Sequence, residues 1–117
     1  MNDKLIKMKA LGNEMRVRIV KLLSLSKEDL CVCSIVDILK VNTYTISKHL
    51  RELKLVGILT ERHSGKYVYY SLCSKNDNFV RNLVKLIDQV EDEYLQKRNI
   101  KIKHLLKTSK NKKYSIK

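Results

Sequence analysis

The 117-residue sequence contains no tryptophan, no proline and only three glycines. Proline and glycine most often interrupt regular structure, so their scarcity favours a helical protein with few tight turns. No apolar run approaches the roughly 20 residues that span a membrane, and the first nine residues do not form a signal-peptide pattern. We therefore expect one cytoplasmic domain, in which an apolar fraction of 44% is enough to build a core.

Cysteine is also scarce: the chain has only Cys31, Cys33 and Cys73. An odd, small number of cysteines argues against a secreted scaffold held by disulfides. In a reducing cytoplasm the three thiols would be available for metal or redox chemistry.

The sequence lacks the patterns of an enzyme, namely a glycine-rich phosphate loop, a nucleophile elbow or a clustered catalytic His/Asp pair. Acidic residues are few: the chain has 12 of them against 25 lysines and arginines, which gives a formal net charge of +13. This excess favours a nucleic-acid partner over a membrane surface, and the alternative is a lysine-rich surface that merely aids solubility. After Glu93 no acidic residue remains, so we expect a domain over residues 1–107 and a disordered basic tail over 108–117.

The spacing of apolar residues predicts the order of the elements. A first short helix lies around residues 5–11, and a second begins after Asn13, which can cap it. Residues 24–29 are polar and indicate a loop, residues 30–33 tolerate a short strand, and a third helix carries Ile35, Ile38 and Leu39.

The segment 42–56 predicts a helix with two unlike faces. Ile46, Leu50 and Leu53 stack on one side, while polar and cationic side chains point away from it. Gly57 ends this helix, and two β-rich runs, 58–62 and 66–72, then surround a turn at residues 63–65.

A helix, a tight connection, a second helix with a polar outer face and a basic hairpin describe a winged helix-turn-helix, a mainly α fold with a small β-hairpin (α+β). The second helix would enter the major groove, and the hairpin tip would follow the backbone or enter the minor groove. His49 lies about 60° from the apolar centre of its helix, so we expect a half-buried structural role for it rather than base reading. The expected DNA-binding residues are Thr43, Tyr44, Thr45, Ser47, Lys48, Arg51, Arg62, His63 and Lys66.

A long helix is expected from Asp77 through Tyr94. Its apolar stripe is too broad for one neighbour, which favours packing against a second copy of the chain, although a purely intrachain helix stays open. The expected dimerisation residues are Leu5, Met8, Phe79, Leu83, Leu86 and Val90.

Three stretches of the sequence resemble the ArsR family of repressors. Residues 10–20 (ALGNEMRVRIV) are similar to the family pattern A-L-x-x-x-x-R-x-x-I-L, with Glu14 where a proline is usual. Residues 46–53 (ISKHLREL) followed by 56–59 (VGIL) are similar to V-S-R-H-L-x-x-L and G-L-V, and residues 65–66 and 69–72 match the family's wing. The resemblance covers roughly residues 8–95 and implies a homodimer that binds an operator in double-stranded DNA and leaves it when a ligand binds.

The cysteines also resemble a family element. Residues 29–36 (DLCVCSIV) are similar to the E-L-C-V-C-D-L-C element of the arsenic- and antimony-responsive branch. Arsenite or antimonite would suit soft thiolate ligands at Cys31 and Cys33. Because residues i and i+2 of a regular helix project about 200° apart, chelation requires this segment to be extended or distorted.

Val36 occupies the family's third cysteine position, so we consider Cys73 as the missing ligand. In a winged helix the strand before the first recognition-unit helix pairs with the second wing strand, which would bring residues 72–73 toward residues 30–31. Without Cys73, arsenite would keep two protein thiolates and one external ligand.

Several alternatives remain at this stage. The cysteines could be buried packing residues, or they could form a redox or persulfide switch. Zinc or cadmium sensing is disfavoured, because Asp88, Glu91 and a distant His104 lack the matching spacing and an N-terminal cysteine pair is missing. A winged module of a methyltransferase would share the fold, and a nonspecific architectural DNA-binding protein is the rival from another class.

Overall fold

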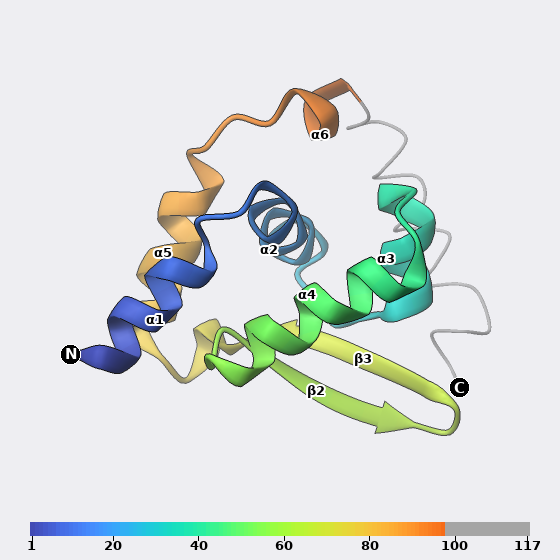
Figure 1. Ribbon diagram of the computed structural model, residues 1–117, viewed down its shortest axis with the longest axis horizontal. Coiled ribbons are helices and arrows are strands. Elements are labelled where there is room, and N and C mark those ends of the chain that lie inside the picture. The colour runs from blue at the N-terminus through green and yellow to red at the C-terminus, as the bar shows by residue number, and fades with distance from the viewer. Residues whose placement is uncertain (98–117) are drawn as a thin grey trace.

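The computed structural model describes residues 1–97, and it combines six α-helices with a three-stranded sheet (Figure 1). The whole basic tail expected over 108–117, and the end of the domain expected to reach residue 107, lie outside the described residues. The elements are α1 (Asn2–Ala10), α2 (Glu14–Ser26), β1 (Leu30–Cys31), α3 (Val32–Leu39), α4 (Thr43–Leu55), β2 (Leu59–Ser64), β3 (Tyr67–Leu72), the 3-10 turn η1 (Cys73–Lys75), α5 (Asn78–Asp88) and α6 (Glu93–Lys97).

The helices begin where side-chain caps are available. Asn13 accepts a hydrogen bond from the backbone N–H of Arg16 at the start of α2, and Asn42 does the same for Thr45 at the start of α4. Asp77 accepts from two backbone N–H groups of α5. These caps satisfy amides that have no partner inside the helix.

Helix α2 continues further than its polar sequence predicts, because residues 24–26 are helical and the loop is limited to 27–29. The hydroxyl of Ser26 donates to the carbonyls of Leu23 and Glu28, and this satisfies the polar side chain inside the fold. Lys27 then ends the helix in a left-handed conformation with φ of 58°.

The sheet is antiparallel in the order β1-β3-β2. Leu30 pairs with Tyr70 and Cys31 with Tyr69, so the predicted pairing of the strand before α3 with the second wing strand is confirmed. The strand is shorter than expected, since Val32 and Cys33 already belong to α3.

The long C-terminal helix that the sequence predicts is divided in two. Helix α5 ends at Asp88, residues 89–92 form a connection, and α6 begins at Glu93. The ammonium of Lys21 donates to the carbonyls of Ile87 and Val90, and the last turn of α5 tightens because Val90 N–H bonds to Ile87. Tyr94 therefore does not extend the apolar stripe of α5.

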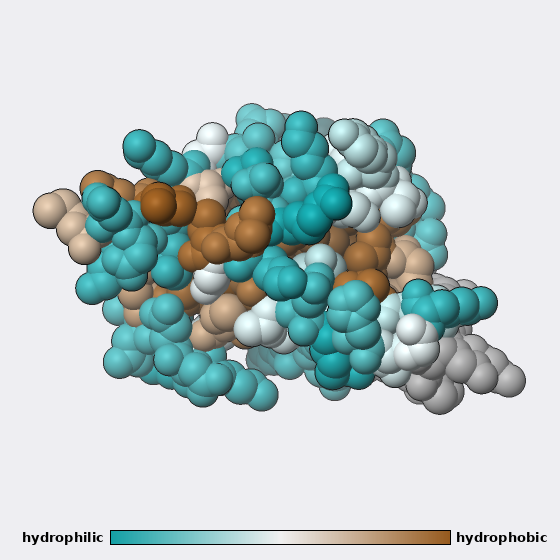
Figure 2. Space-filling view, turned by 60° about the horizontal axis from the view of Figure 1, so that its bottom comes forward, coloured by the Kyte–Doolittle hydropathy of each residue, from teal (hydrophilic) through white to brown (hydrophobic). Residues whose placement is uncertain are grey.

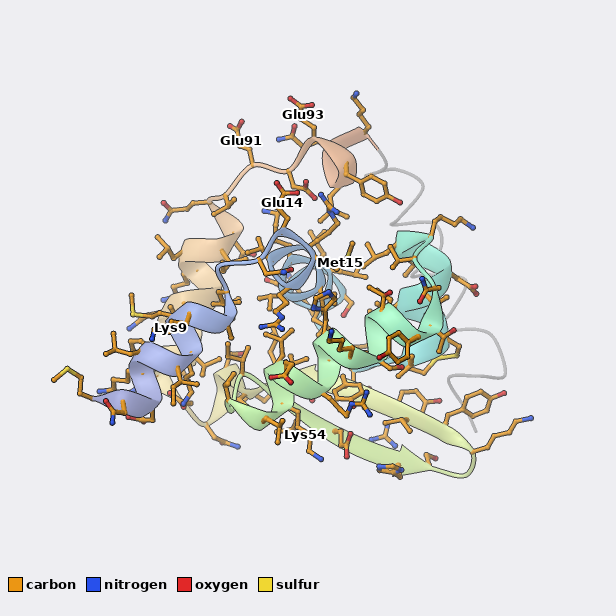
Figure 3. The ribbon with its side chains drawn as sticks, viewed as in Figure 1. Lys9, Glu14, Met15, Lys54, Glu91 and Glu93 are labelled. Atoms are coloured by element: carbon orange, nitrogen blue, oxygen red, sulfur yellow. A yellow bond between two sulfur atoms is a disulfide. The ribbon has the colours of Figure 1, made fainter. Side chains whose placement is uncertain are left out.

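Helix α2 runs through the centre of the molecule, with α1 and α5 on one side and α3 with the beginning of α4 on the other (Figure 1). Helix α4 then crosses below α2 toward α1, and the hairpin lies below α4 (Figure 1). Ile19, Ile35, Ile46, Leu50 and Leu53 are fully buried around it. Figure 3 shows Met15 and Glu14 at the start of α2, between these two groups of helices. Among residues 1–97 no helix is both long and apolar enough to cross a membrane.

Candidate nucleic-acid interface and cysteine pair

Helices α3 and α4 form the helix-turn-helix, joined by the short connection 40–42. Lys40 adopts a left-handed conformation with φ of 58°, which ends α3, and Asn42 then caps α4. Figure 3 shows α4 and strand β2 at the edge of the molecule, with Lys54 between the end of the helix and the strand. Both elements can thus approach one surface together.

The outer face of α4 carries most of the side chains expected to read DNA. Thr43, Tyr44, Lys48 and Arg51 are exposed, and Tyr44 exposes 74% of its surface. Thr45 and Ser47 are half-buried beside them. A helix presenting hydroxyl, phenol and cationic groups from its first turns has the composition that base edges and phosphates require.

His49 lies off this face, as the angular position predicts. It is half-buried, and its Nδ1 accepts a hydrogen bond of 3.1 Å from Nε of Arg16. Burial lowers the pKa of His49, and the positive charges of Arg16 and Lys48 lower it further. A neutral histidine that orients an arginine of α2 therefore helps to fix α4 against the core.

The structure separates the three wing residues that the sequence groups at the tip. Arg62 lies on β2 opposite Tyr69, where its guanidinium bonds to Asp29 at 2.6 Å and stacks on the Tyr69 ring at 4.5 Å. His63 projects to the other face of the strand, and its Nε2 lies 3.4 Å from Glu61. Lys66 is at the turn itself, which Gly65 forms with a positive φ of 60°.

Glu61 is a functional neighbour that the sequence reasoning missed. Its carboxylate accepts hydrogen bonds from Lys54 at 2.6 Å and from Tyr70 at 2.7 Å. The bond from Lys54, followed by that from Tyr70, lowers the pKa of Glu61 to about 2, while burial and this carboxylate raise the pKa of Tyr70 to about 12. Glu61 thereby ties the end of α4 to the wing, and its place opposite Tyr70 becomes visible only with the strand register.

Cys31 and Cys33 lie together at the beginning of α3. Their sulfurs are joined, and their Cα atoms are 5.4 Å apart. Cys31 precedes the helix in an extended conformation (ψ of 157°), so the two side chains are not constrained to the opposite sides of a helical turn. The Cys31 sulfur also accepts a hydrogen bond of 3.3 Å from the backbone N–H of Ser34.

The structure does not bring Cys73 to this pair. Cys31 is opposite Tyr69, and Cys73 follows four residues later along the chain, which corresponds to roughly 13 Å of strand. Cys73 is half-buried, and burial, with a further contribution from Asp77, raises the pKa of its thiol. No cluster of three or more His, Cys, Asp or Glu residues with metal-binding geometry occurs in the described part of the chain.

Helices α1 and α5 expose an apolar surface on the same side of the molecule. Leu5, Met8, Leu86 and Val90 expose 44%, 53%, 58% and 45% of their surface, and Phe79 and Leu83 are half-buried. Apolar side chains are visible among polar ones on the left of Figure 2, the side on which α1 lies. The inward side of α5 is formed instead by Val80, Val84 and Ile87.

The sequence of this chain matches a family model described as "Bacterial regulatory protein, arsR family" over residues 13–61. It is 48% identical over 77 residues to a cadmium resistance transcriptional regulatory protein CadC homolog of Staphylococcus aureus, covering 66% of this chain and 60% of that protein. It is 30% identical over 97 residues to the arsenic resistance transcriptional regulator ArsR2 of Pseudomonas putida, covering 83% and 84% of the two chains.

The fold agrees with these sequence matches. The solution structure of the homodimeric winged helix-turn-helix DNA-binding domain Mb0332 from Mycobacterium bovis superimposes with a TM-score of 0.65 at 30% identity, covering 80% of this chain and 82% of that one. The chain therefore belongs to the ArsR family of transcriptional regulators, which are winged helix-turn-helix DNA-binding proteins and not enzymes.

Proposed function

We propose that this protein is a homodimeric repressor that binds an operator through α4 and the wing, and that leaves the operator when arsenite or antimonite binds Cys31 and Cys33. The observation that carries the proposal is that the sulfurs of Cys31 and Cys33 are joined at the beginning of α3, the helix directly before α4. A ligand held there would act on the first half of the DNA-binding unit.

The environment of the sulfurs suits thiolate ligands. The N-terminal end of a helix favours negative charge, and the N–H of Ser34 already donates to the sulfur of Cys31. With the pair reduced, each thiol would replace one hydroxide of arsenous acid and release one water, so that arsenic would keep two As–S bonds and one external oxygen ligand. The third ligand would come from outside the protein, because Val36 stands where the family has its third cysteine and Cys73 lies four residues beyond the residue opposite Cys31.

The ligand site and the DNA-binding face are mechanically connected. Helix α3 packs against α4 through a shared core that includes Ile35, Ile38 and Ile46. An arsenic atom bound across Cys31 and Cys33 would distort the first turn of α3, and a conformation of α3 that binds arsenic better but DNA worse would be selected. Release from DNA would follow from this difference in affinity.

The experiment that tests the ligand is an anaerobic titration of the reduced protein with arsenite, followed by near-ultraviolet absorbance of the thiolate–arsenic bond. We expect saturation at about one equivalent per subunit. Cys31→Ser and Cys33→Ser should each abolish the signal, and Cys73→Ser should retain it. A flat titration of the wild type would refute the metalloid proposal, and loss of the signal in Cys73→Ser would place that thiol in the site.

The experiment that tests the function uses operator DNA. Cys33→Ser should bind the operator as tightly as the wild type and should fail to dissociate when arsenite is added. A footprint limited to one inverted repeat supports a repressor, whereas uniform coating of DNA supports an architectural protein. Equal release of the mutant and the wild type would remove Cys33 from the mechanism.

A second candidate function is a thiol redox switch, because the structure joins the sulfurs of Cys31 and Cys33. Here a peroxide would accept two electrons and two protons from the dithiol, so that hydrogen peroxide is reduced to two waters and the disulfide is left. Oxidation without arsenite should then release the operator, and a thiol reductant should restore binding. The titration and the operator release are also measured with cadmium, because several relatives are named for cadmium resistance.

A further inference from the structure

Helix α3 is held at both of its ends. At its beginning the sulfur of Cys31 accepts the N–H of Ser34, and at its end the carbonyl of Leu39 accepts a hydrogen bond of 2.6 Å from the hydroxyl of Tyr94. Tyr94 belongs to α6, which follows the exposed helix α5. A segment from the C-terminal part of the fold thus contacts the helix that begins with the cysteine pair.

Tyr94 is itself fixed by neighbours from α2. The guanidinium of Arg18 lies 4.9 Å from the centre of the Tyr94 ring and forms two bonds, of 2.8 and 3.0 Å, with the carboxylate of Asp92. Both side chains of this ion pair are 17% exposed, and the bond from Arg18 lowers the pKa of Asp92. Leu95, the next residue after Tyr94, is buried in the core.

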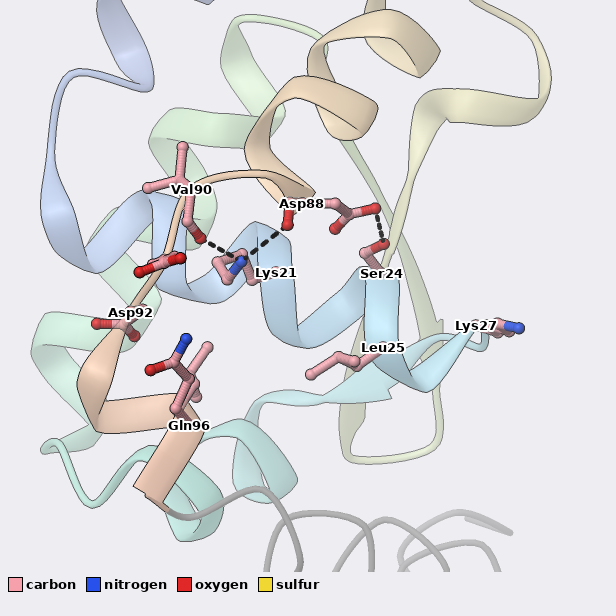
Figure 4. Close-up of a pocket in the computed structure, with 10 residues that line it drawn as sticks. Lys21, Ser24, Leu25, Lys27, Asp88, Val90, Asp92 and Gln96 are labelled. Atoms are coloured by element: carbon pink, nitrogen blue, oxygen red, sulfur yellow. Dashed lines mark hydrogen bonds between the residues drawn. The ribbon is translucent and has the colours of Figure 1, made fainter.

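The connection 89–92 joins this fixed point to α5. Lys21 bonds to the carbonyls of Val90, at 2.6 Å, and Asp88, at 3.5 Å, and Ser24 bonds to the carboxylate of Asp88 (Figure 4). A cavity of about 510 Å³ lies beside the connection, lined by residues of α2 and of 88–96. The connection therefore has space on one side into which it can move.

We propose that the hydrogen bond from Tyr94 to Leu39 is a latch through which the state of the Cys31–Cys33 pair is transmitted to α5. The proposal rests on the proposed function for the identity of the ligand at the pair. Helix α3 has eight residues, so its first turn and the Leu39 carbonyl are about two turns apart, and in this proposal a change at the first turn shifts that carbonyl. A short hydroxyl–carbonyl bond is lost with a small change of distance and angle, and its loss disconnects Tyr94 from α3 while Arg18 and Lys21 still bind the connection 89–92 from α2.

The consequence is a path from the ligand to the surface on which the second subunit is expected. Leu86 lies near the end of α5 and Val90 lies in the connection 89–92, where Lys21 binds its carbonyl; both are exposed apolar residues. In this proposal, opening of the latch lets the connection shift toward the cavity beside it and changes the position of these residues. The ligand would then alter the relative placement of the two subunits as well as the first turn of α3.

The test measures the coupling factor, which is the ratio of the operator Kd with saturating arsenite to the Kd without it. We expect Tyr94→Phe to lower this factor about fivefold, the effect of losing one hydrogen bond. Its arsenite affinity in the absence of DNA should equal that of the wild type. Asn78→Ala is the control, since it removes a side-chain bond of 2.6 Å with Arg81 at the start of α5, away from α3 and from the connection 89–92, and should leave the coupling factor unchanged.

A second measurement separates the latch from the metalloid proposal. Hydrogen exchange of the amides of residues 93–97, which include Gln96 bonded to Asp92 at 2.9 Å, should become faster when the pair is loaded with arsenite. The same comparison is made after the dithiol is oxidised with an azodicarboxamide, which accepts the two hydrogens and becomes a hydrazine. The number of remaining free thiols is measured to confirm that the oxidation is complete.

The outcomes are distinct. If arsenite does not bind but oxidation of the pair accelerates exchange at 93–97, the metalloid proposal fails and the latch stands. If a pair that is demonstrably loaded or oxidised leaves this exchange unchanged, the latch is refuted. An unchanged coupling factor in Tyr94→Phe would also refute it.

Discussion

At the scale of single residues, the neighbours of a side chain decide whether it is available to DNA. Arg62 and Lys66 are both basic residues of the wing, yet Arg62 is engaged by Asp29 and the Tyr69 ring while Lys66 stands at the turn. An arginine that must break an ion pair to reach a phosphate contributes less to binding than an exposed one. We therefore expect Lys66 to contribute more than Arg62 to the affinity of the wing for DNA.

Lys48 is the cation at the centre of the outer face of α4, where base edges would lie. We expect Lys48→Ala to weaken operator binding about tenfold and to weaken binding to random-sequence DNA less, because a contact to a base is lost only on the operator. Fluorescence anisotropy with both DNAs measures the two affinities. Lys85→Ala on α5 is the control, and an equal loss on both DNAs would make Lys48 a phosphate contact.

Glu61 makes the stability of the hairpin depend on pH. Its pKa is about 2 in the folded protein and near 4.5 in the absence of its partners, so its stabilising contribution is complete above pH 4.5 and is lost as the pH falls toward 2. We expect Glu61→Gln to lower the Tm at pH 7 and to reduce the difference in Tm between pH 7 and pH 3. Glu91→Gln, at an exposed carboxylate, should change neither, and a wild-type pH dependence in Glu61→Gln would contradict this assignment.

Residue roles could be predicted where they follow from helical angle alone. The inward Ile46, Leu50 and Leu53 and the half-buried His49 lie where the 100° spacing places them. Contacts between residues far apart in the sequence could not be predicted, because nothing in the local sequence indicates that Arg62 binds Asp29. The same holds for Tyr94, which the apolar spacing places at the end of one long helix and whose hydroxyl donates to the carbonyl of Leu39 in the structure.

At the scale of elements, caps decide where the DNA-reading helix begins. The side-chain oxygen of Asn42 lies 2.9 Å from the amide of Thr45, in the turn that carries Thr43 and Tyr44. We expect Asn42→Ala to cost about 1 kcal/mol of unfolding free energy and to weaken operator binding, because the first turn of α4 frays. Urea unfolding and operator titration measure the two effects.

Asn42→Ser is the matched variant for this test, since serine retains a capping oxygen. It should recover most of the stability and affinity that alanine loses. If alanine and serine were equally destabilising, the amide of Asn42 would act through a contact other than the cap.

The sequence predicts elements well where a cap, a glycine or strict periodicity marks their limits, as for α2 at Asn13, α4 at Asn42 and α5 at Asp77. It fails at the C-terminal end of α5. The residues of 89–94 continue the apolar spacing, but the ammonium of Lys21 and the guanidinium of Arg18 bind groups of this segment from α2. Interactions from a distant element therefore overrule the local preference for a helix.

At the scale of the whole molecule, the apolar surface of α1 and α5 is expected to form the dimer interface. We expect Leu86→Lys to yield monomers at concentrations where the wild type is dimeric, and to lower operator affinity, because two linked subunits hold two half-sites. Sedimentation velocity measures the oligomeric state. Leu25→Lys, at a 48% exposed leucine of α2, is the control and should remain dimeric.

If Leu86→Lys remained a dimer, the interface would have to lie elsewhere on the surface. If it became a monomer that kept the full operator affinity, dimerisation would not contribute to DNA binding. The net charge of +13 per chain would then account for the affinity by contacts with phosphates.

The sequence alone determined the order of the elements, the two faces of α4 and the close spacing of the two cysteines at the beginning of α3, because each depends on residues less than about two helical turns apart. Tertiary structure decided the end of α5, the engagement of Arg62 by Asp29, the distance of Cys73 from the pair and the contact of Tyr94 with α3. These features join residues 33 to 74 positions apart or depend on strand register, and packing of the complete chain, rather than local preference, selects such contacts.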